Sequence, residues 1–290
     1  MPELTANGTK IYYERFGSEN DPPVLFVSGL GSQIVYWRPG FVDPIVDAGF
    51  QVILFENRDS GYSQHFDDAR VSVMRVVEAI AAGEKPDVPY LLSEMADDAV
   101  GLLDALGIEH AHILGVSMGG YIAQVAAARH PDRILTLTSI MSSTGNPEVG
   151  RATPEMTEAL FTAPPTERQA AIQSTVDYAR LAWGDYFDEA RARETAARNL
   201  DRVVYPEGTG RQLAAILATG DRTADLKGIT VPALVIHGEK DPLIDPSGGI
   251  ATADAIPDAE LWIVPGMGHD LPPELDPELT GRIVEHFGSS

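Results

Sequence analysis

The chain has 290 residues, of which 44% are hydrophobic and 22% charged, and its formal net charge is −22. This length suits one large α/β domain with room for an insertion, and the composition is that of a globular rather than a disordered chain. The strong negative charge argues against nucleic acid and against anionic membrane surfaces as partners.

Two further features narrow the class of protein. The chain contains no cysteine, which excludes disulfides, thiolate metal sites and a cysteine nucleophile. The opening MPELTANGTK lacks a basic region followed by an apolar core, and no apolar run approaches the roughly 18 residues that a membrane span needs. We therefore expect a soluble cytoplasmic protein.

Short apolar runs alternate with amphipathic stretches along the chain. Asn7 and Gly8 separate two β-prone runs, which is a strong hairpin signal. Beyond this hairpin the pattern predicts strands at 23–29, 51–57, 111–116, 133–141, 232–238 and 260–266, and helices at 41–50, 93–106, 118–130, 248–256 and 277–287. Strands alternating with helices imply right-handed crossovers and a mostly parallel central sheet flanked by helices.

The interval 146–226 interrupts this alternation. Four amphipathic stretches follow one another there without a strand, at 152–160, 166–183, 186–200 and 210–219. A linker would be poorer in apolar residues than this segment. We therefore predict a core domain of residues 1–145 and 227–290 with a helical cap, 146–226, inserted between two strands.

A serine stands where a predicted strand becomes a predicted helix, in the sequence GVSMGG. In a strand–turn–helix of this kind the serine is held in a left-handed conformation that lifts its side chain clear of the sheet. Gly115 and Gly119 lack the Cβ atoms that would crowd this turn. The alternative is a purely structural serine that caps the helix. The strand–turn–helix context instead favours Ser117 as a nucleophile at a helix N-terminus, where negative charge is stabilised.

A serine nucleophile needs a histidine base and an orienting acid. In folds with this motif the chain order is serine, acid, histidine, which favours His269 in the glycine-flanked loop after the last predicted strand. His286, on the last predicted helix, is expected at the surface. The remaining histidines precede Ser117, or end a predicted helix or strand: His65, His110, His112, His130 and His237.

The loop after the strand at 232–238 offers three acids. Asp241 precedes a proline, which favours an extended backbone and a side chain turned back toward the strand ends. Asp245 also precedes a proline, and we expect it to cap the next helix. Glu239 is the third candidate.

Taken together these segments resemble the α/β-hydrolase superfamily, and the resemblance covers nearly the whole chain. It is carried by VSGLGS, ENRDSGYS, GVSMGG, HGEKDPLI and PGMGHDLP. Within the superfamily the chain looks most like the aclacinomycin methylesterase group and related carboxylesterases, whose N/H-R-D-x-G-x-S segment is matched by 57–63. Many members have histidine where this chain has Ser28, and Asp-x-Arg-Gly where it has Glu-Asn-Arg-Asp at 56–59.

The resemblance implies a fold, a site and a reaction. It implies a triad of Ser117, Asp241 and His269, and an oxyanion hole formed by the backbone N–H groups of Leu30 and Met118. It implies hydrolysis of a small-molecule carboxylic ester, such as a methyl ester of a polyketide, through an acyl-enzyme and with no metal or organic cofactor. Arg58 is expected to serve structure by tying the 57–63 loop.

Two other functions compete with ester hydrolysis. The same triad would serve carbon–carbon bond hydrolysis, lactone opening or haloperoxidase-like perhydrolysis, and a hydrolase fold can also serve as a non-catalytic ligand receptor. For the substrate pocket we predict bulky aromatic residues beside the nucleophile and in the cap, although packing alone would explain any one of them: Trp37, Trp183, Tyr186, Phe187 and Tyr205.

Overall fold

A computed structural model describes residues 2–163 and 165–289. The described residues form one eight-stranded sheet in the order β1-β2-β4-β3-β5-β6-β7-β8, in which β2 runs antiparallel to both of its neighbours, β1 and β4, and the other neighbouring strands pair in parallel. The strands are β1 Glu3–Ala6, β2 Thr9–Phe16, β3 Pro23–Val27, β4 Gln51–Phe55, β5 Ala111–Val116, β6 Ile134–Ile140, β7 Ala233–Gly238 and β8 Glu260–Val264. The predicted mostly parallel α/β architecture is confirmed.

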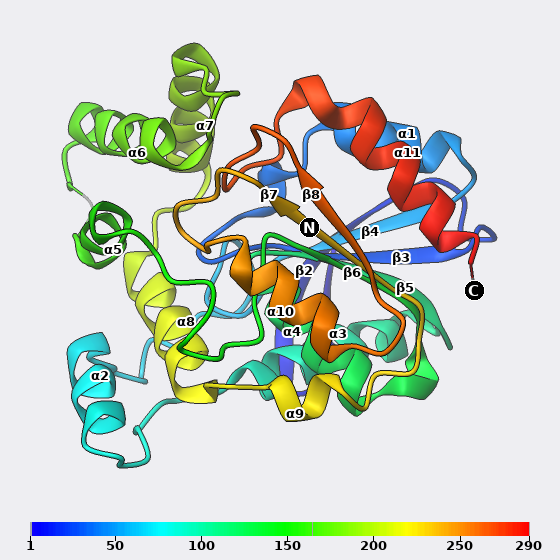
Figure 1. The fold of residues 1–290 in the computed structure, drawn as a ribbon, viewed down its shortest axis with the longest axis horizontal. Coiled ribbons are helices and arrows are strands. Elements are labelled where there is room, and N and C mark those ends of the chain that lie inside the picture. Colours follow the sequence, from blue (N-terminus) through cyan, green and yellow to red (C-terminus); the bar gives the residue numbers. More distant parts are fainter. Residues whose placement is uncertain (1, 164, 290) are drawn as a thin grey trace.

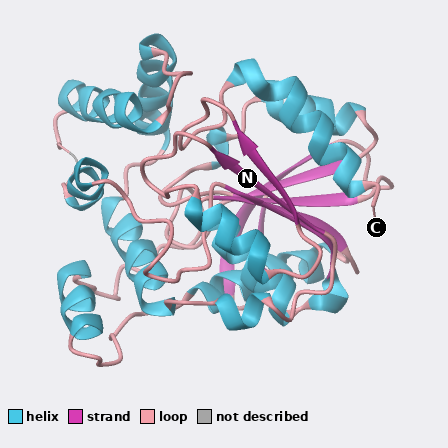
Figure 2. Cartoon of the chain, viewed as in Figure 1, coloured by secondary structure: helices cyan, strands magenta, loops and turns pink. Residues whose placement is uncertain are grey.

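Helices cover both faces of the sheet, as Figures 1 and 2 show. Their bounds are α1 Pro39–Asp47, α2 Val73–Ala81, α3 Leu92–Leu106, α4 Met118–Arg129, α5 Pro154–Phe161, α6 Arg168–Ala182, α7 Glu189–Arg202, α8 Pro206–Thr219, α9 Thr223–Leu226, α10 Ser247–Ala255 and α11 Asp276–Phe287. Helices α1 and α11 pack together on one face, and α3, α4 and α10 lie on the other. Each face has its own buried apolar cluster.

The N-terminal hairpin forms where the sequence predicts it. Asn7 and Gly8 have φ values of 48° and 74°, the left-handed conformation that a two-residue turn with the twist of its strands requires. Strand β2 then pairs with β4, which places the hairpin at one edge of the sheet. Helix α2, by contrast, was not predicted, although its apolar residues recur at helical spacing; Val76 is the residue of α2 that the structure buries.

The predicted helical insertion is present and packs over one end of the sheet (Figure 1). The two ends of the segment meet, because the backbone N–H of Arg222 donates to the carbonyl of Thr144 at 2.8 Å. Helices α6 and α7 pack against each other, whereas α9 lies against α4 and α10 in the core. The exact boundaries 146 and 226 stay a prediction.

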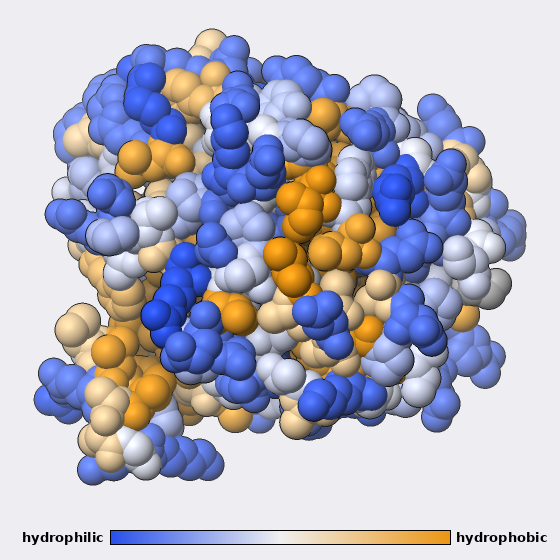
Figure 3. Space-filling view, viewed as in Figure 1, coloured by the Kyte–Doolittle hydropathy of each residue, from blue (hydrophilic) through white to orange (hydrophobic). Residues whose placement is uncertain are grey.

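The surface in the view of Figure 3 is mostly polar, in keeping with the large net charge. Apolar side chains gather over α2 and the adjoining part of α8, where Met74 and Ile80 are exposed, and over α10 and β8, where Ile250 and Leu261 are exposed. Within the described residues, no helix is long and apolar enough to cross a membrane.

The expectation that His286 lies at the surface is wrong. It faces the sheet, where Nε2 lies 3.1 Å from the carbonyl oxygen of Leu137, and it is only 7% exposed. His112 on β5 is buried nearby, against Phe287 and hydrogen-bonded through Nδ1 to Thr136 Oγ1 at 2.9 Å. Burial, and then the proximity of His286, lowers the pKa of His112 to about 4.

This buried histidine makes stability depend on pH. The imidazole of His112 takes up a proton near pH 6.5 in the unfolded chain but only near pH 4 in the folded chain. The free energy of unfolding is therefore highest above pH 6.5 and decreases as the pH falls toward 4. We expect this group to lower the free energy of unfolding by roughly 3 kcal/mol across that range. His112→Phe should flatten the pH dependence in urea titrations. Parallel curves for the two proteins would contradict this origin.

Candidate active site

Ser117 occupies a sharp turn between β5 and α4. Its φ and ψ are 53° and −120°, a strained conformation for a residue with a side chain, which costs on the order of 1–3 kcal/mol. The turn is held by its own backbone, because the Ser117 N–H donates to the carbonyl of Ile140 in β6 at 2.9 Å. Ser142 Oγ donates in turn to the Ser117 carbonyl at 3.0 Å.

The two glycines flanking the serine are needed for different reasons. A Cβ on Gly115 would overlap the carbonyl of Gly119, which is the crowding within the turn that the sequence predicts. A Cβ on Gly119 would instead overlap the carbonyl of Val27, at the end of the neighbouring strand β3. Gly119 therefore allows α4 to start directly against the sheet.

The structure brings Ser117, His269 and Asp241 together from three separate loops. Nε2 of His269 lies 2.9 Å from Ser117 Oγ, and Nδ1 lies 2.7 Å from Asp241 Oδ2. The ionised carboxylate of Asp241 can only accept a hydrogen bond, so Nδ1 carries the hydrogen and donates it, and Nε2 is left to accept the hydrogen bond of the serine hydroxyl. The side chain of Asp241 is fully buried and that of His269 is 9% exposed, so water screens neither contact.

Asp241 is held as an anion by its surroundings. Burial alone would raise its pKa, but the contacts with His269 and His237 outweigh burial and lower it to about 2. Its other oxygen, Oδ1, accepts the N–H groups of Leu243 and Ile244, each at 2.9 Å. Four donors therefore face one carboxylate.

The other two acids of this loop have different partners. Asp245 Oδ1 accepts the N–H of Ser247, the first residue of α10, at 2.9 Å, although the N-cap position itself is Pro246, one residue later than expected. Glu239 Oε2 accepts the N–H of Gly266 at 3.1 Å. Among the described acids, Asp241 is the one in contact with His269.

Leu30 and Met118 line the same pocket as Ser117 and His269. Met118 is the first residue of α4, so its N–H has no partner within the helix. In the described part of the chain, neither of these two backbone N–H groups donates a hydrogen bond. Both are therefore available to an anionic oxygen beside Ser117.

The pocket beside Ser117 has a volume of about 680 Å³, which is large enough for a medium-sized organic molecule. Of the five aromatic residues predicted to line it, Trp183 does so. Three tyrosines that were not predicted line it as well, namely Tyr36, Tyr121 and Tyr178.

The other four aromatic residues are not in the pocket lining, so the prediction is wrong for them. Trp37 is buried beneath it and donates through Nε1 to Ser28 Oγ at 2.9 Å, and Tyr186 packs on the apolar cluster of the α1–α11 face. Phe187 packs inside the cap under Arg180. Tyr205 stacks on His65, with ring centroids 3.8 Å apart.

The cap also contacts the loop that carries His269, a feature the sequence did not reveal. The His269 N–H donates to the carbonyl of Ala182 at 2.6 Å, at the end of α6. Asp270 is buried and pairs with Arg191 of α7 at 2.6 Å. The guanidinium of Arg191 lies 3.8 Å from the ring centre of Trp183, so this ion pair also fixes one wall of the pocket.

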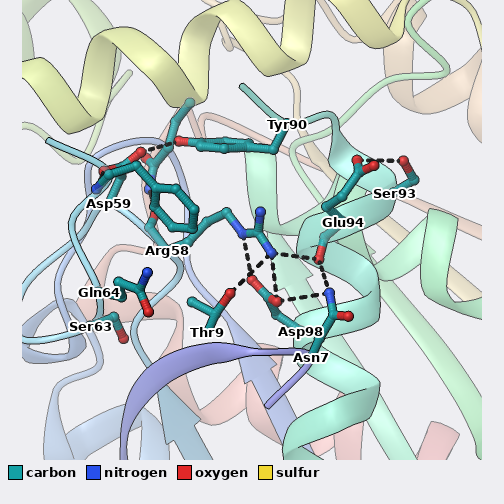
Figure 4. A network of polar contacts seen from close by, with 12 residues as sticks. Asn7, Thr9, Arg58, Asp59, Ser63, Gln64, Tyr90, Ser93, Glu94 and Asp98 are labelled. Carbon is teal, nitrogen blue, oxygen red and sulfur yellow. Dashed lines mark hydrogen bonds and ion pairs between the residues drawn. The ribbon is translucent and has the colours of Figure 1, made fainter. Parts of the chain in front are cut away.

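Arg58 anchors the 57–63 loop, as expected. Its Nε and Nη2 lie 2.6 Å and 2.7 Å from the two oxygens of Asp98 on α3 (Figure 4). Asn7 also donates to Asp98, at 3.2 Å, so the hairpin turn joins the same network. Because the pair is buried and its carboxylate is shared among several donors, it fixes the loop at the base of the site.

Comparisons with known proteins agree with this geometry. A model of the alpha/beta hydrolase fold matches residues 22–274. The chain belongs to this family. The predicted resemblance to the α/β-hydrolase superfamily is thus confirmed, and the chain is a hydrolase of this family.

Individual relatives extend the likeness. Rhodomycin D methylesterase DauP of a Streptomyces species is 28% identical over 307 residues, which cover 98% of this chain and 96% of that protein. The enol-lactonase of Burkholderia xenovorans has a TM-score of 0.73 at 26% identity and covers 99% of this chain and 100% of its own. A meta-cleavage product hydrolase of Pseudomonas fluorescens has a TM-score of 0.76 at 20% identity, covering 100% and 98%, which is a likeness of fold alone.

The placement of the cap aromatics gives a matched pair of variants. Trp183→Ala removes a pocket wall, so it should change the ranking of short against long p-nitrophenyl esters, chiefly through KM. Phe187 packs against the Trp183 ring, with centroids 6.2 Å apart, but does not line the pocket, so Phe187→Ala should lower the melting temperature and alter that ranking far less. Melting curves and kinetics on both esters separate the effects. An unchanged ranking in Trp183→Ala would show that this wall does not contact substrate.

Proposed function

We propose that this chain is a serine hydrolase that cleaves carboxylic esters through an acyl-enzyme. The observation that supports it most is the continuous hydrogen-bonded series from Ser117 Oγ through His269 to Asp241, with distances of 2.9 Å and 2.7 Å. The series opens into an organic-sized pocket. These are the parts that nucleophilic acyl transfer needs: nucleophile, base, orienting acid and a space for the acyl group.

The reaction proceeds in two stages on these residues. His269 Nε2 takes the hydroxyl proton as Ser117 Oγ attacks the ester carbonyl, and Asp241 stabilises the imidazolium. The N–H groups of Leu30 and Met118 bind the oxyanion, a contribution whose loss typically costs on the order of 10²–10³ in rate. The alcohol leaves with the proton from His269. Water, deprotonated by the same imidazole, then releases the acid from Ser117.

For the substrate we propose a methyl ester of an oxygenated, largely apolar small molecule. The likeness to a rhodomycin D methylesterase over 98% of the chain supports a methyl ester. The hydroxyl groups of Tyr36, Tyr121 and Tyr178 support the proposal that the substrate carries oxygen atoms. Within the described chain none of them makes a hydrogen bond, and none is sealed inside the protein, so they are open to the pocket.

The three hydroxyls stay protonated under any ordinary condition. Burial raises the pKa of Tyr121 to about 12, and it raises the pKa of Tyr36 and of Tyr178 further still. They therefore act as neutral donors inside a mainly apolar space, where an unpaired partner is costly. Oxygen atoms on the substrate would satisfy them.

Lactone opening is the second candidate, because a lactone is a cyclic ester and needs the same groups. The likeness to an enol-lactonase, at 26% identity over 99% of the chain, supports it. Turnover of linear methyl esters and of lactones of equal size should be compared directly. A preference for the lactone by tenfold or more would replace the methyl ester as the proposed substrate.

The nucleophile and the acid are tested by substitution. Ser117→Ala should reduce ester turnover by several orders of magnitude and leave the fold intact, because only the attacking oxygen is lost. Asp241→Asn should lose much of the rate. Asp245→Asn and Glu239→Gln are matched controls in the same loop and should retain it. Near-normal turnover by Ser117→Ala, or equal losses in all three loop variants, would contradict these roles.

The tyrosine hydroxyls are tested by single Tyr→Phe changes at 36, 121 and 178. The wild type should prefer a hydroxylated naphthoate methyl ester over the unsubstituted one. Each Tyr→Phe change that removes a hydroxyl in contact with the substrate should reduce that preference by about fivefold, which corresponds to the loss of one hydrogen bond. The ratio of kcat/KM for the two esters is the measurement. An unaltered ratio in all three variants would remove the oxygenated body from the proposed substrate.

A further inference from the structure

His237, the next-to-last residue of β7, is a completely buried histidine beside the proposed acid. Its Nε2 lies 2.7 Å from the carbonyl oxygen of Ile244 and 3.4 Å from Asp241 Oδ2. The strand end and the far end of the acid-bearing loop are thus joined through one imidazole.

The contacts fix the tautomer of His237. A carbonyl oxygen can only accept, so Nε2 carries the hydrogen and donates to Ile244. Nδ1 is then the bare nitrogen. In the described chain it has no hydrogen-bond partner, and Gly249 of α10 is packed so closely against it that a Cβ there would overlap the ring. The same Nε2–H dipole faces Asp241, at a distance longer than a good hydrogen bond.

Asp241 therefore receives donors on both sides. Oδ1 takes two backbone N–H groups, while Oδ2 takes His269 Nδ1 and faces His237 Nε2. Because the carboxylate lies between two imidazoles, movement toward either one changes its contact with the other. Tyr121 of α4 and Tyr178 of α6 are further ionisable groups that interact with it.

We propose that His237 is a positioning residue that acts on His269 through Asp241. It closes the acid-bearing loop by binding the Ile244 carbonyl, and its N–H dipole draws part of the negative charge on Oδ2 away from His269. Without it the carboxylate becomes more basic and less firmly placed. The protonated form of His269 is then favoured even before Ser117 attacks, although His269 must be neutral at that point to accept the serine proton.

This inference rests on the proposed function, and it predicts a change that packing alone would not produce. His237→Leu should lower kcat roughly tenfold, as expected for loss of a contact to a charged group. The acid limb of its kcat/KM profile should move to higher pH, because a more basic Asp241 favours protonated His269. His237→Gln, whose side-chain amide replaces Nε2–H, should recover most of kcat and restore the acid limb.

His286 supplies the matched control. It is also a buried histidine with Nε2 close to a backbone carbonyl, that of Leu137, but it does not touch Ser117, His269 or Asp241. His286→Leu should lose stability while keeping kcat and the acid limb. Melting temperatures of all variants are measured with the kinetics, so that loss of folded protein is counted separately.

One readout is independent of turnover. In the Ser117→Ala background, the proton between His269 Nδ1 and Asp241 should give a far-downfield NMR resonance, which His237→Leu should shift or broaden and His237→Gln should largely restore. If Ser117→Ala keeps its ester activity, the proposed function fails, but this resonance still tests His237. An unmoved resonance and acid limb in His237→Leu, or equal effects of Leu and Gln, would overturn the proposal.

Discussion

The left-handed turn at Ser117 is the constraint on which the rest of the site depends. It places Ser117 directly between the end of β5 and the start of α4, which itself begins in contact with the sheet. That contact requires glycine at 119, against the carbonyl of Val27. Since the hydrogen bond from Ser117 to β6 also fixes this turn, three neighbouring strands determine where the nucleophile points.

The cap is joined to the core by buried ion pairs as well as by apolar packing. Asp59 has φ 65°, a conformation that favours glycine, asparagine and aspartate. Its carboxylate accepts Nε and Nη2 of Arg211 from α8 at 2.8 Å and 2.9 Å. Glu56 likewise pairs with Arg202 of α7. The buried pair of Asp59 with Arg211 thus ties α8 of the cap to the 57–63 loop of the core.

Sequence patterns predict the structural features that depend on residues close together in the chain. The strand–serine–helix turn, the hairpin at Asn7 and the loop that carries His269 each depend on residues close in sequence, and the structure has all three. The pocket walls depend on how distant helices face one another, which periodicity does not reveal. Phe187 therefore lies inside the cap while Tyr36, from a short turn, lines the pocket. His286 was misplaced for the same reason, since a polar residue on a helix can face the sheet when a backbone carbonyl there accepts its hydrogen bond.

Substrate selection and base placement are not separate tasks in this fold. The candidate triad lies outside the inserted segment 146–226, and four of the five predicted pocket aromatics lie inside it. Yet His269 gives its backbone N–H to Ala182 of α6, and its neighbour Asp270 is held by Arg191 of α7, which also supports the pocket wall at Trp183. Movement of α6 away from the core would break the hydrogen bond that holds the His269 loop. A cap that opened as a rigid lid would therefore also displace the proposed base, so substrate entry and the geometry of the base are physically coupled.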